Sequence, residues 1–166
     1  MKAGVDLYCS EGTAHSEGLQ GHRLHILKAG VQVSIGPWRI MPFDVVHDCE
    51  EPLGFLIAKG DERCVFLTDT NYCPYRFKGL TAIMIGVDYS TDLLKQNTLA
   101  GTVDPERAKR TLQNHMSLDT ALEFFRANDM SRVQEIHLVH LSDQNSDAEQ
   151  FRQAVERVTG RPVYVA

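Results

Sequence analysis

The chain has 166 residues, of which 43% are hydrophobic and 23% are charged, and its formal net charge is −5. This length and composition are those of an ordinary globular protein, so we expect residues 1–166 to form a single domain. The acidic balance argues against a broadly basic nucleic-acid-binding surface, and the absence of any run of about 18 apolar residues excludes a membrane-spanning helix.

The N-terminus and the cysteines bear on the cellular compartment. Residues 1–6 lack the long apolar core of a secretory signal peptide. The four cysteines show neither C-x-x-C spacing nor a pairing pattern, which indicates free thiols in a reducing compartment. We therefore expect a cytoplasmic protein without a membrane partner. Cys49 stays open as a metal ligand, because it lies two residues after His47.

The first two-thirds of the chain has the pattern of β-strands. A further apolar run over 80–87 is too short for a helix and also predicts a strand. The other runs rich in β-branched and aromatic residues are separated by turn residues. They predict strands over 5–9, 31–35, 38–46, 55–58, 64–68 and 136–139.

The last third has the pattern of helices. The segment 91–103 is polar, and we expect it to be irregular. After it, an N-cap residue followed by proline, an apolar stripe at helical spacing and the capping box Ser146–Glu149 each predict a helix. These helices are expected over 104–113, 118–128 and 146–160, and a final short strand over 163–165. The chain is therefore expected to be of the α+β class.

Three of the apolar runs end at a residue type that binds divalent metals, namely His47, Asp69 and His140. Strands that stop at such residues place them at one rim of a sheet, where distant parts of the chain converge on a rigid support. The pattern predicts a metallohydrolase. A single histidine at the end of a strand is more often a surface or hydrogen-bonded residue than a metal ligand, and a single aspartate there is often a turn residue, so the prediction depends on the three together.

The order of short motifs around these residues resembles a known family. The motifs are H-D-x-x-x-P-x-G-F from His47, T-D-T around Asp69, H-M-S from His115 and H-L-S-x-x-N from His140. Together they resemble the C-terminal two-thirds of metallo-β-lactamase-fold hydrolases, in particular the exonuclease-like branch of bacteria and phages, over roughly residues 5–145. The resemblance implies a metallo-β-lactamase-like αββα sandwich that is incomplete at the N-terminus.

The resemblance also implies a role for each matching residue. In that family the rim of the sheet holds two divalent ions: His47 would bind the first, Asp69 would bridge both and His140 would bind the second. We expect zinc, with manganese as the alternative, and a metal-activated water as nucleophile. Asp69 and His115 are the expected catalytic residues, with His115 donating a proton to a leaving oxygen or holding a phosphate oxygen.

Further polar residues lie close in sequence to the expected ligands. Asp48 and Ser142 are expected to orient the imidazoles or to contact substrate, and so is Asn145, five positions after His140. Gly86 stands where many relatives carry a glutamate, and we expect Asp88 to replace that contact in part.

The most diagnostic motif of the family, H-x-H-x-D-H after an early strand, does not occur in this sequence. Without it neither ion would have three protein ligands, so we expect low metal occupancy and a sheet edge open to pairing with a second copy. The spacing of His22 and His25 fits one helix face, but together with His15 we expect them to be exposed loop histidines rather than replacement ligands.

The sequence thus predicts a metal-dependent hydrolase that acts on phosphodiesters of nucleic acid. The substrate comes from the resemblance alone, and thioesters, lactones and cyclic nucleotides remain open. The alternative from a different class is a catalytically silent half-domain that serves as an interaction or oligomerisation module, pairing through its exposed sheet edge.

Overall fold

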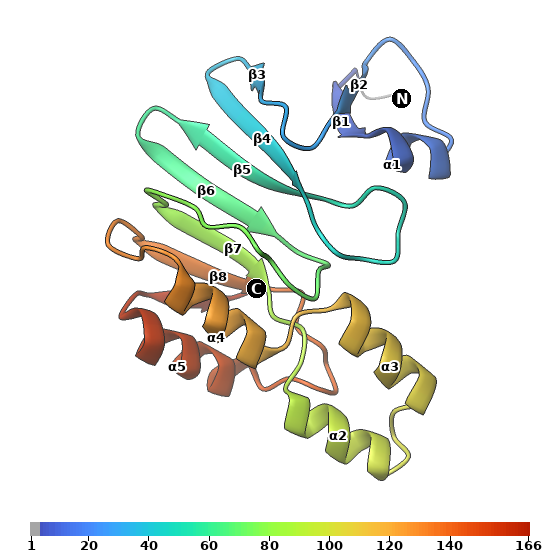
Figure 1. The fold of residues 1–166 in the computed structure, drawn as a ribbon, viewed down its shortest axis with the longest axis vertical. Helices are drawn as coiled ribbons and strands as arrows, with labels where there is room; N and C mark the ends of the chain where they lie inside the picture. Colours follow the sequence, from blue (N-terminus) through green and yellow to red (C-terminus); the bar gives the residue numbers. More distant parts are fainter. Residues whose placement is uncertain (1–3) are drawn as a thin grey trace.

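The computed structural model describes residues 4–166, which form nine strands and five helices (Figure 1). Seven strands make one sheet in the order β3-β4-β5-β6-β7-β8-β9, and β1 and β2 make a separate parallel pair. In chain order the elements are β1 (Leu7–Ser10), α1 (Glu11–Ser16), β2 (Leu24–Leu27), β3 (Val33–Ile35), β4 (Trp38–Asp44), β5 (Leu53–Lys59), β6 (Glu62–Leu67), β7 (Ala82–Gly86), α2 (Thr91–Leu99), α3 (Pro105–Asn114), α4 (Leu118–Ala127), β8 (Glu135–Val139), α5 (Ala148–Thr159) and β9 (Val163–Val165).

The direction of the strands decides which chain segments meet. Strands β3 to β6 pair antiparallel, whereas β6 to β9 pair parallel. Parallel neighbours need long crossovers, and α2, α3 and α4 lie in the one between β7 and β8. Because β5 runs in the opposite sense between β4 and β6, the carboxyl ends of β4, β6, β7 and β8 share one edge of the sheet.

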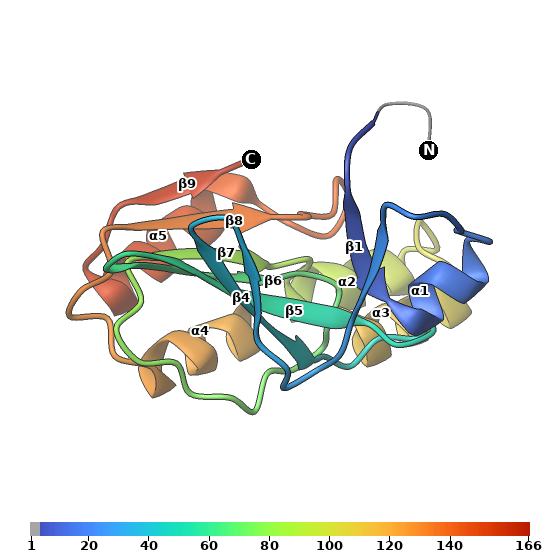
Figure 2. The same cartoon turned by 90° about the horizontal axis from the view of Figure 1, so that it is seen from above.

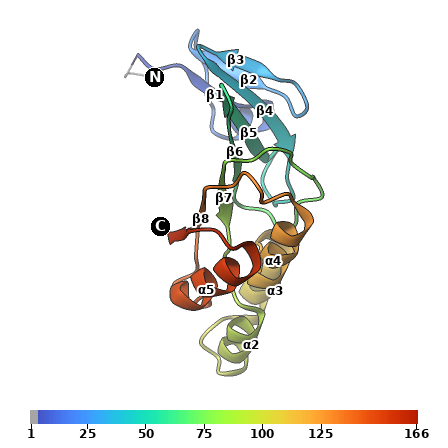
Figure 3. The ribbon, with the colours of Figure 1, turned by 90° about the vertical axis from the view of Figure 1, so that its left-hand side faces the viewer.

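Helices α4 and α5 cover one face of the sheet, and the core lies between them and the strands (Figure 3). In β6, Val65 and Leu67 are fully buried on that face, whereas Cys64 and Phe66 point to the opposite face and stay partly exposed. Phe125 and Phe151 supply the largest side chains of the helical layer. No helix within residues 4–166 has the length and apolarity needed to cross a bilayer.

Most predicted elements are confirmed, with bounds that differ by no more than two residues at either end. The strand predicted over 38–46 ends at Asp44, because the Val46 amide donates to the Thr70 hydroxyl at 2.9 Å instead of to a neighbouring strand. The prediction of an irregular segment over 91–103 is wrong, since α2 occupies most of it. Ser90 caps α2, but Leu94 is the only buried residue of this helix, so it leaves no apolar stripe in the sequence.

The N-terminal region also differs from the prediction. Helix α1 and strand β2 were not predicted, and β1 and β2 lie beside the main sheet (Figure 2). His22 and His25 do not share a helix face, because His25 lies on strand β2. There its ring stacks on Tyr8 with centroids 4.5 Å apart. The capping residue of α5 is Asp147 rather than Ser146, whose hydroxyl donates to the Ser142 carbonyl.

Candidate metal centre

The residues predicted as metal ligands follow the carboxyl ends of β4, β6 and β8 and meet at one edge of the sheet. Asp69 and His140 both adopt left-handed backbone conformations, with φ of 46° and 62°. Such conformations cost about 1–3 kcal/mol each for residues other than glycine and cluster at functional sites, where the surroundings hold them in place. The two side chains are therefore placed by the fold at an energetic cost.

Hydrogen bonds hold the loop after β4 against the loop after β6. Thr70, which is 1% exposed, accepts the Val46 amide at 2.9 Å and donates to the Tyr72 carbonyl at 2.9 Å. This single threonine joins the loop of His47 to the loop of Asp69. The last threonine of the T-D-T motif thus has a structural role, since together with the Asn71 amide, which donates to the Val46 carbonyl at 3.3 Å, it holds these two loops side by side.

His140 and Asp69 point their ligand atoms at each other. His140 Nε2 lies 3.3 Å from Asp69 Oδ1, and His140 Nδ1 donates to Asp88 Oδ1. An ionised carboxylate only accepts hydrogen bonds, so the contact with Asp88 fixes the proton on Nδ1 and leaves the lone pair of Nε2 free. This is the arrangement of a metal-binding histidine whose second nitrogen is held by a carboxylate.

His115 lies between two carboxylates. Its Nδ1 is 3.2 Å from Asp88 Oδ1 and 3.8 Å from Asp69 Oδ1, yet it is buried and no hydrogen-bond direction fits. The interaction with Asp88 raises the pKa of His115 above its ordinary value. Burial opposes this rise, and the charges of Asp69 and Asp48 add to it. The site therefore favours the protonated imidazole.

His47 completes the cluster. Its Nδ1 is buried without a hydrogen-bond partner among the described residues, although Asp48 Oδ1 is 3.3 Å away. A buried nitrogen without a partner costs about 1–3 kcal/mol, which a cation bound to its lone pair would offset. The ring of His47 meets that of His115 edge to face, with centroids 5.5 Å apart.

Two overlapping sets of side chains fit a metal ion. The ligand atoms of His47, Asp69 and His115 lie within 4.8 Å of one another, and so do those of Asp88, His115 and His140. Imidazole and carboxylate donors in such a set suit zinc and also manganese. The donor atoms and the partnerless nitrogen of His47 therefore fit a divalent cation, and each set offers three protein ligands when His115 is neutral.

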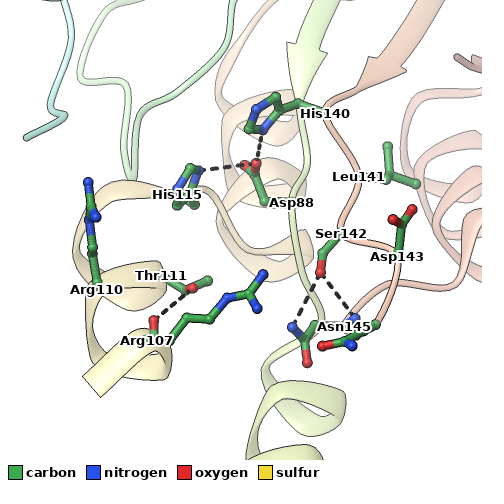
Figure 4. Close-up of a pocket in the computed structure, with 11 residues that line it drawn as sticks. Asp88, Arg107, Arg110, Thr111, His115, His140, Leu141, Ser142, Asp143 and Asn145 are labelled. Carbon is green, nitrogen blue, oxygen red and sulfur yellow. Dashed lines mark hydrogen bonds and ion pairs between the residues drawn. The ribbon is translucent and has the colours of Figure 1, made fainter. Parts of the chain in front are cut away.

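A cavity of about 540 Å³ opens beside His115 and His140 (Figure 4). Helix α3 forms one wall, and the loop after β8 forms another. Among its lining residues are Arg107, Arg110, Ser142 and Asn145. The cavity is large enough for part of a substrate next to the metal-binding cluster.

The structure brings together His47, Asp69, His115 and His140, as the sequence predicts. Asp48 makes a different contact, because it pairs with Arg110, whose Nε lies 2.7 Å from Asp48 Oδ2. This hydrogen bond lowers the pKa of Asp48 and joins α3 to the loop of His47.

The remaining predicted residues lie beside the cluster or away from it. Ser142 and Asn145 line the cavity and bond to each other. Cys49 is exposed and belongs to neither set of metal-binding side chains. His15 pairs with Glu50 and His25 with Asp6, so neither replaces a ligand at this site.

Asp88 has a larger part in the site than its sequence position indicates, and Arg107 and Arg110 are additional site residues that the motifs do not include. Asp88 is 4% exposed, contacts two imidazoles and accepts the Met116 amide at 3.1 Å. The sequence does indicate a site position for Asp88, because this residue follows the predicted strand over 80–87 at the same edge of the sheet. Arg107 and Arg110 are three residues apart on α3 and so share a face, but nothing in the sequence points that face toward the metal ligands.

Comparison with known proteins agrees with this geometry. Residues 3–140 match the family described as the Beta-lactamase superfamily domain. The chain belongs to this family. In sequence it is 27% identical over 158 residues to the exodeoxyribonuclease WalJ of Streptococcus pneumoniae serotype 2, covering 87% of this chain and 57% of that protein. The WalJ protein of a second pneumococcal strain gives the same values.

Solved structures share the fold. The metallo-β-lactamase fold protein YhfI from Bacillus subtilis matches with a TM-score of 0.68 at 14% identity, covering 96% of this chain and 61% of that one. Zn²⁺-bound PqqB from Methylobacterium extorquens matches with a TM-score of 0.64 at 14% identity, covering 97% of this chain and 62% of that one. The predicted α+β class and metallo-β-lactamase-like architecture are confirmed. The chain spans 57% of the length of the curated relatives that it matches.

Proposed function

We propose that this member of the superfamily is a metal-dependent hydrolase that acts on phosphodiesters of nucleic acid. The observation that carries the proposal is the meeting of His47, Asp69, His115 and His140 at one edge of the sheet, with two buried nitrogens lacking partners. The sequence similarity to an exodeoxyribonuclease supports the choice of substrate.

The proposed ligands divide between two cation positions. His47 and Asp69 would hold one ion, and Asp69 and His140 would hold the second, with zinc as the expected metal and manganese as the alternative. A bound ion of this kind lowers the pKa of water toward neutrality and so supplies a nucleophile. Because few protein ligands surround either position, we expect this chain to bind metal more weakly than a site with three or more ligands per ion.

The side chains themselves supply orientation and a proton. Asp88 holds the ring of His140 with Nε2 toward Asp69. His115, whose pKa is raised by Asp88, carries a proton at higher pH than an ordinary histidine and would give it to the leaving oxygen. The cavity beside His115 leaves room for the leaving group.

Metal binding and hydrolysis test the proposal together. We expect saturable binding of Zn²⁺ or Mn²⁺ by calorimetry and metal-dependent cleavage of an end-labelled oligodeoxynucleotide, both lost in Asp69→Asn and His140→Ala. His22→Ala is the matched control, because His22 is an exposed histidine outside both sets of ligands. If the unsubstituted chain neither binds metal nor cleaves with either ion, the proposal is wrong for this chain.

A second candidate function is a catalytically silent interaction module. It is favoured by the free edge of β3, which ends the seven-stranded sheet and has no further strand beside it among residues 4–166. Val31 and Trp38, beside this edge, are 54% and 44% exposed. Self-association through β3 with no metal-dependent cleavage would favour this candidate.

A further inference from the structure

One wall of the cavity beside the metal-binding cluster offers an unpaired positive charge. Figure 4 shows Arg107 reaching from α3 toward the loop that carries Ser142 and Asn145. The neighbouring Arg110 is engaged by Asp48 at 2.7 Å, whereas Arg107 forms no ion pair with any residue of the described chain. Of the two guanidinium groups in the cavity, that of Arg107 is thus free to bind an anion.

A chain of hydrogen bonds fixes the direction of the Ser142 hydroxyl. The Gln144 carbonyl only accepts, so the group 2.8 Å from it is the amide nitrogen of Asn97. The same nitrogen lies 3.0 Å from Asn145 Oδ1, which turns Asn145 Nδ2 toward Ser142 Oγ at 3.3 Å. The Asn145 backbone amide also donates to Ser142 Oγ, at 3.2 Å.

The hydroxyl group of Ser142 still has a hydrogen-bond donor that no residue uses among those that the structure describes. Its oxygen already accepts two hydrogen bonds from Asn145, and its own O–H has no acceptor among the described residues. Asn97, on α2, acts here as a positioning residue, because it sets the orientation of the Asn145 amide. The Ser142 hydroxyl and the Arg107 guanidinium thus line the same cavity as donors.

The carboxylates of the cavity do not neutralise these donors. Asp88 is engaged by His115 and His140. Asp143 is exposed, lies on the far side of Ser142 from Arg107 in Figure 4, and forms no ion pair with that arginine. A guanidinium and a hydroxyl that both donate match the oxygens of a phosphate, which a guanidinium fork binds through two parallel hydrogen bonds.

We propose that Arg107 and the Ser142 hydroxyl bind a phosphate of the substrate next to the one that is hydrolysed, and that the substrate is a nucleic-acid strand. This inference rests on the proposed function, because it takes the metal-binding cluster as the place of hydrolysis. The volume of about 540 Å³ exceeds what one phosphate group needs and leaves room for the adjoining nucleotide.

Binding of a strand to the metal-free chain tests the proposal without any hydrolysis. The probe is a fluorescent single-stranded oligothymidylate, measured by anisotropy in EDTA at several salt concentrations. We expect Arg107→Gln to weaken binding roughly tenfold, and to reduce the slope of log affinity against log salt by about 0.7 to 1. Ser142→Ala should weaken binding by a smaller factor.

Arg126→Gln is the matched control, since it removes the same charge from an exposed arginine on α4 that does not line the cavity. We expect it to bind the strand like the unsubstituted chain. Equal binding by Arg107→Gln and Arg126→Gln, or no binding by the unsubstituted chain, overturns the proposal. Thermal melts followed by circular dichroism show that each variant is folded.

Competition with inorganic pyrophosphate separates the two sources of phosphate. If Arg107→Gln weakens pyrophosphate binding but leaves strand binding unchanged, the site takes a small phosphate compound and the nucleic-acid part of the proposal is wrong. Because these measurements exclude metal, their failure is distinct from that of the proposed function, which is seen only as a loss of metal binding and metal-dependent cleavage.

Discussion

Asp88 is the residue on which the geometry of the site depends most. Its buried carboxylate contacts His115 and His140 and accepts the Met116 amide, and its backbone amide donates to the Met116 carbonyl at 2.9 Å. One side chain therefore fixes the loops that follow β7 and β8 and the segment before α4. A carboxylate in this position would orient His140, the proposed metal ligand, and make its free nitrogen more basic.

Replacing Asp88 by asparagine should loosen His140 without removing any proposed ligand of the metal. We expect Asp88→Asn to reduce zinc affinity about 10- to 100-fold, because the amide lacks the charge that holds the imidazole. Calorimetric titration of zinc measures the change. Asp143→Asn, which alters an exposed carboxylate of the same cavity, should bind zinc like the unsubstituted chain; an equal loss in both variants would refute the role given to Asp88.

The raised pKa of His115 has a consequence for the metal-free protein. Because Asp88 raises the pKa of His115 in the folded state, protonation of His115 stabilises the fold. This contribution is fully present below the unfolded pKa of about 6.5 and is lost as the pH rises through the higher folded value. Titration of the imidazole by NMR should show a lower pKa for His115 in Asp88→Asn, and an unchanged pKa would contradict this account.

Single residues also show what the sequence predicts well and what it does not. His47, Asp69 and His140 were found because each follows an apolar strand, and the same rule applies to Asp88. The role of Arg107 was not predictable, since it depends on where the crossover places α3. The free hydroxyl of Ser142 depends on an amide 45 positions away, Asn97, which only tertiary structure brings near.

At the scale of elements, strands and helices with a buried face were predicted and the others were not. Helix α4 buries Ala121, Phe124 and Phe125, so its apolar spacing is visible in the sequence. Helix α2 buries only Leu94, and α1 has six residues, so both depend on their capping serines and on tertiary contacts.

Helix α3 carries both arginines of the cavity, and its N-cap provides a test of how firmly it is held. Asp104 accepts hydrogen bonds from the amides of Glu106 and Arg107, at 2.9 and 3.1 Å. We expect Asp104→Ala to lower the free energy of unfolding by about 1 kcal/mol, as measured in urea. Asp61→Ala, in the turn between β5 and β6, is a suitable control and should change the stability by less than about 0.5 kcal/mol.

On the scale of the whole molecule, helices α4 and α5 cover one face of the main sheet, and no strand of residues 4–166 lies beside the outer edge of β3. Cys64, Phe66 and Met84 on the other face are partly exposed. A partly apolar face and an open edge are features through which chains associate. The same molecule thus combines the candidate metal centre at one edge of the sheet with surfaces suited to a protein partner.

Self-association should therefore depend on concentration and involve β3. Sedimentation velocity is expected to show a dimer at high protein concentration, and Ser34→Lys should shift it toward the monomer, because a charged side chain on an edge strand opposes pairing. Ser16→Lys adds the same charge to α1 and should leave the dimer intact. A monomer at all concentrations would exclude the homo-oligomer predicted from the sequence.

The left-handed backbone at Asp69 and His140 costs stability at two positions where the proposed function needs a side chain. Glycine occupies such conformations without strain, so glycine at either position would relieve about 1–3 kcal/mol of strain, less the roughly 0.4–1 kcal/mol that its extra conformational entropy costs on folding. A laboratory selection for heat resistance alone would therefore favour the loss of these two side chains. The proposed metal site needs an aspartate and a histidine in conformations that suit glycine better, because glycine offers no ligand atom.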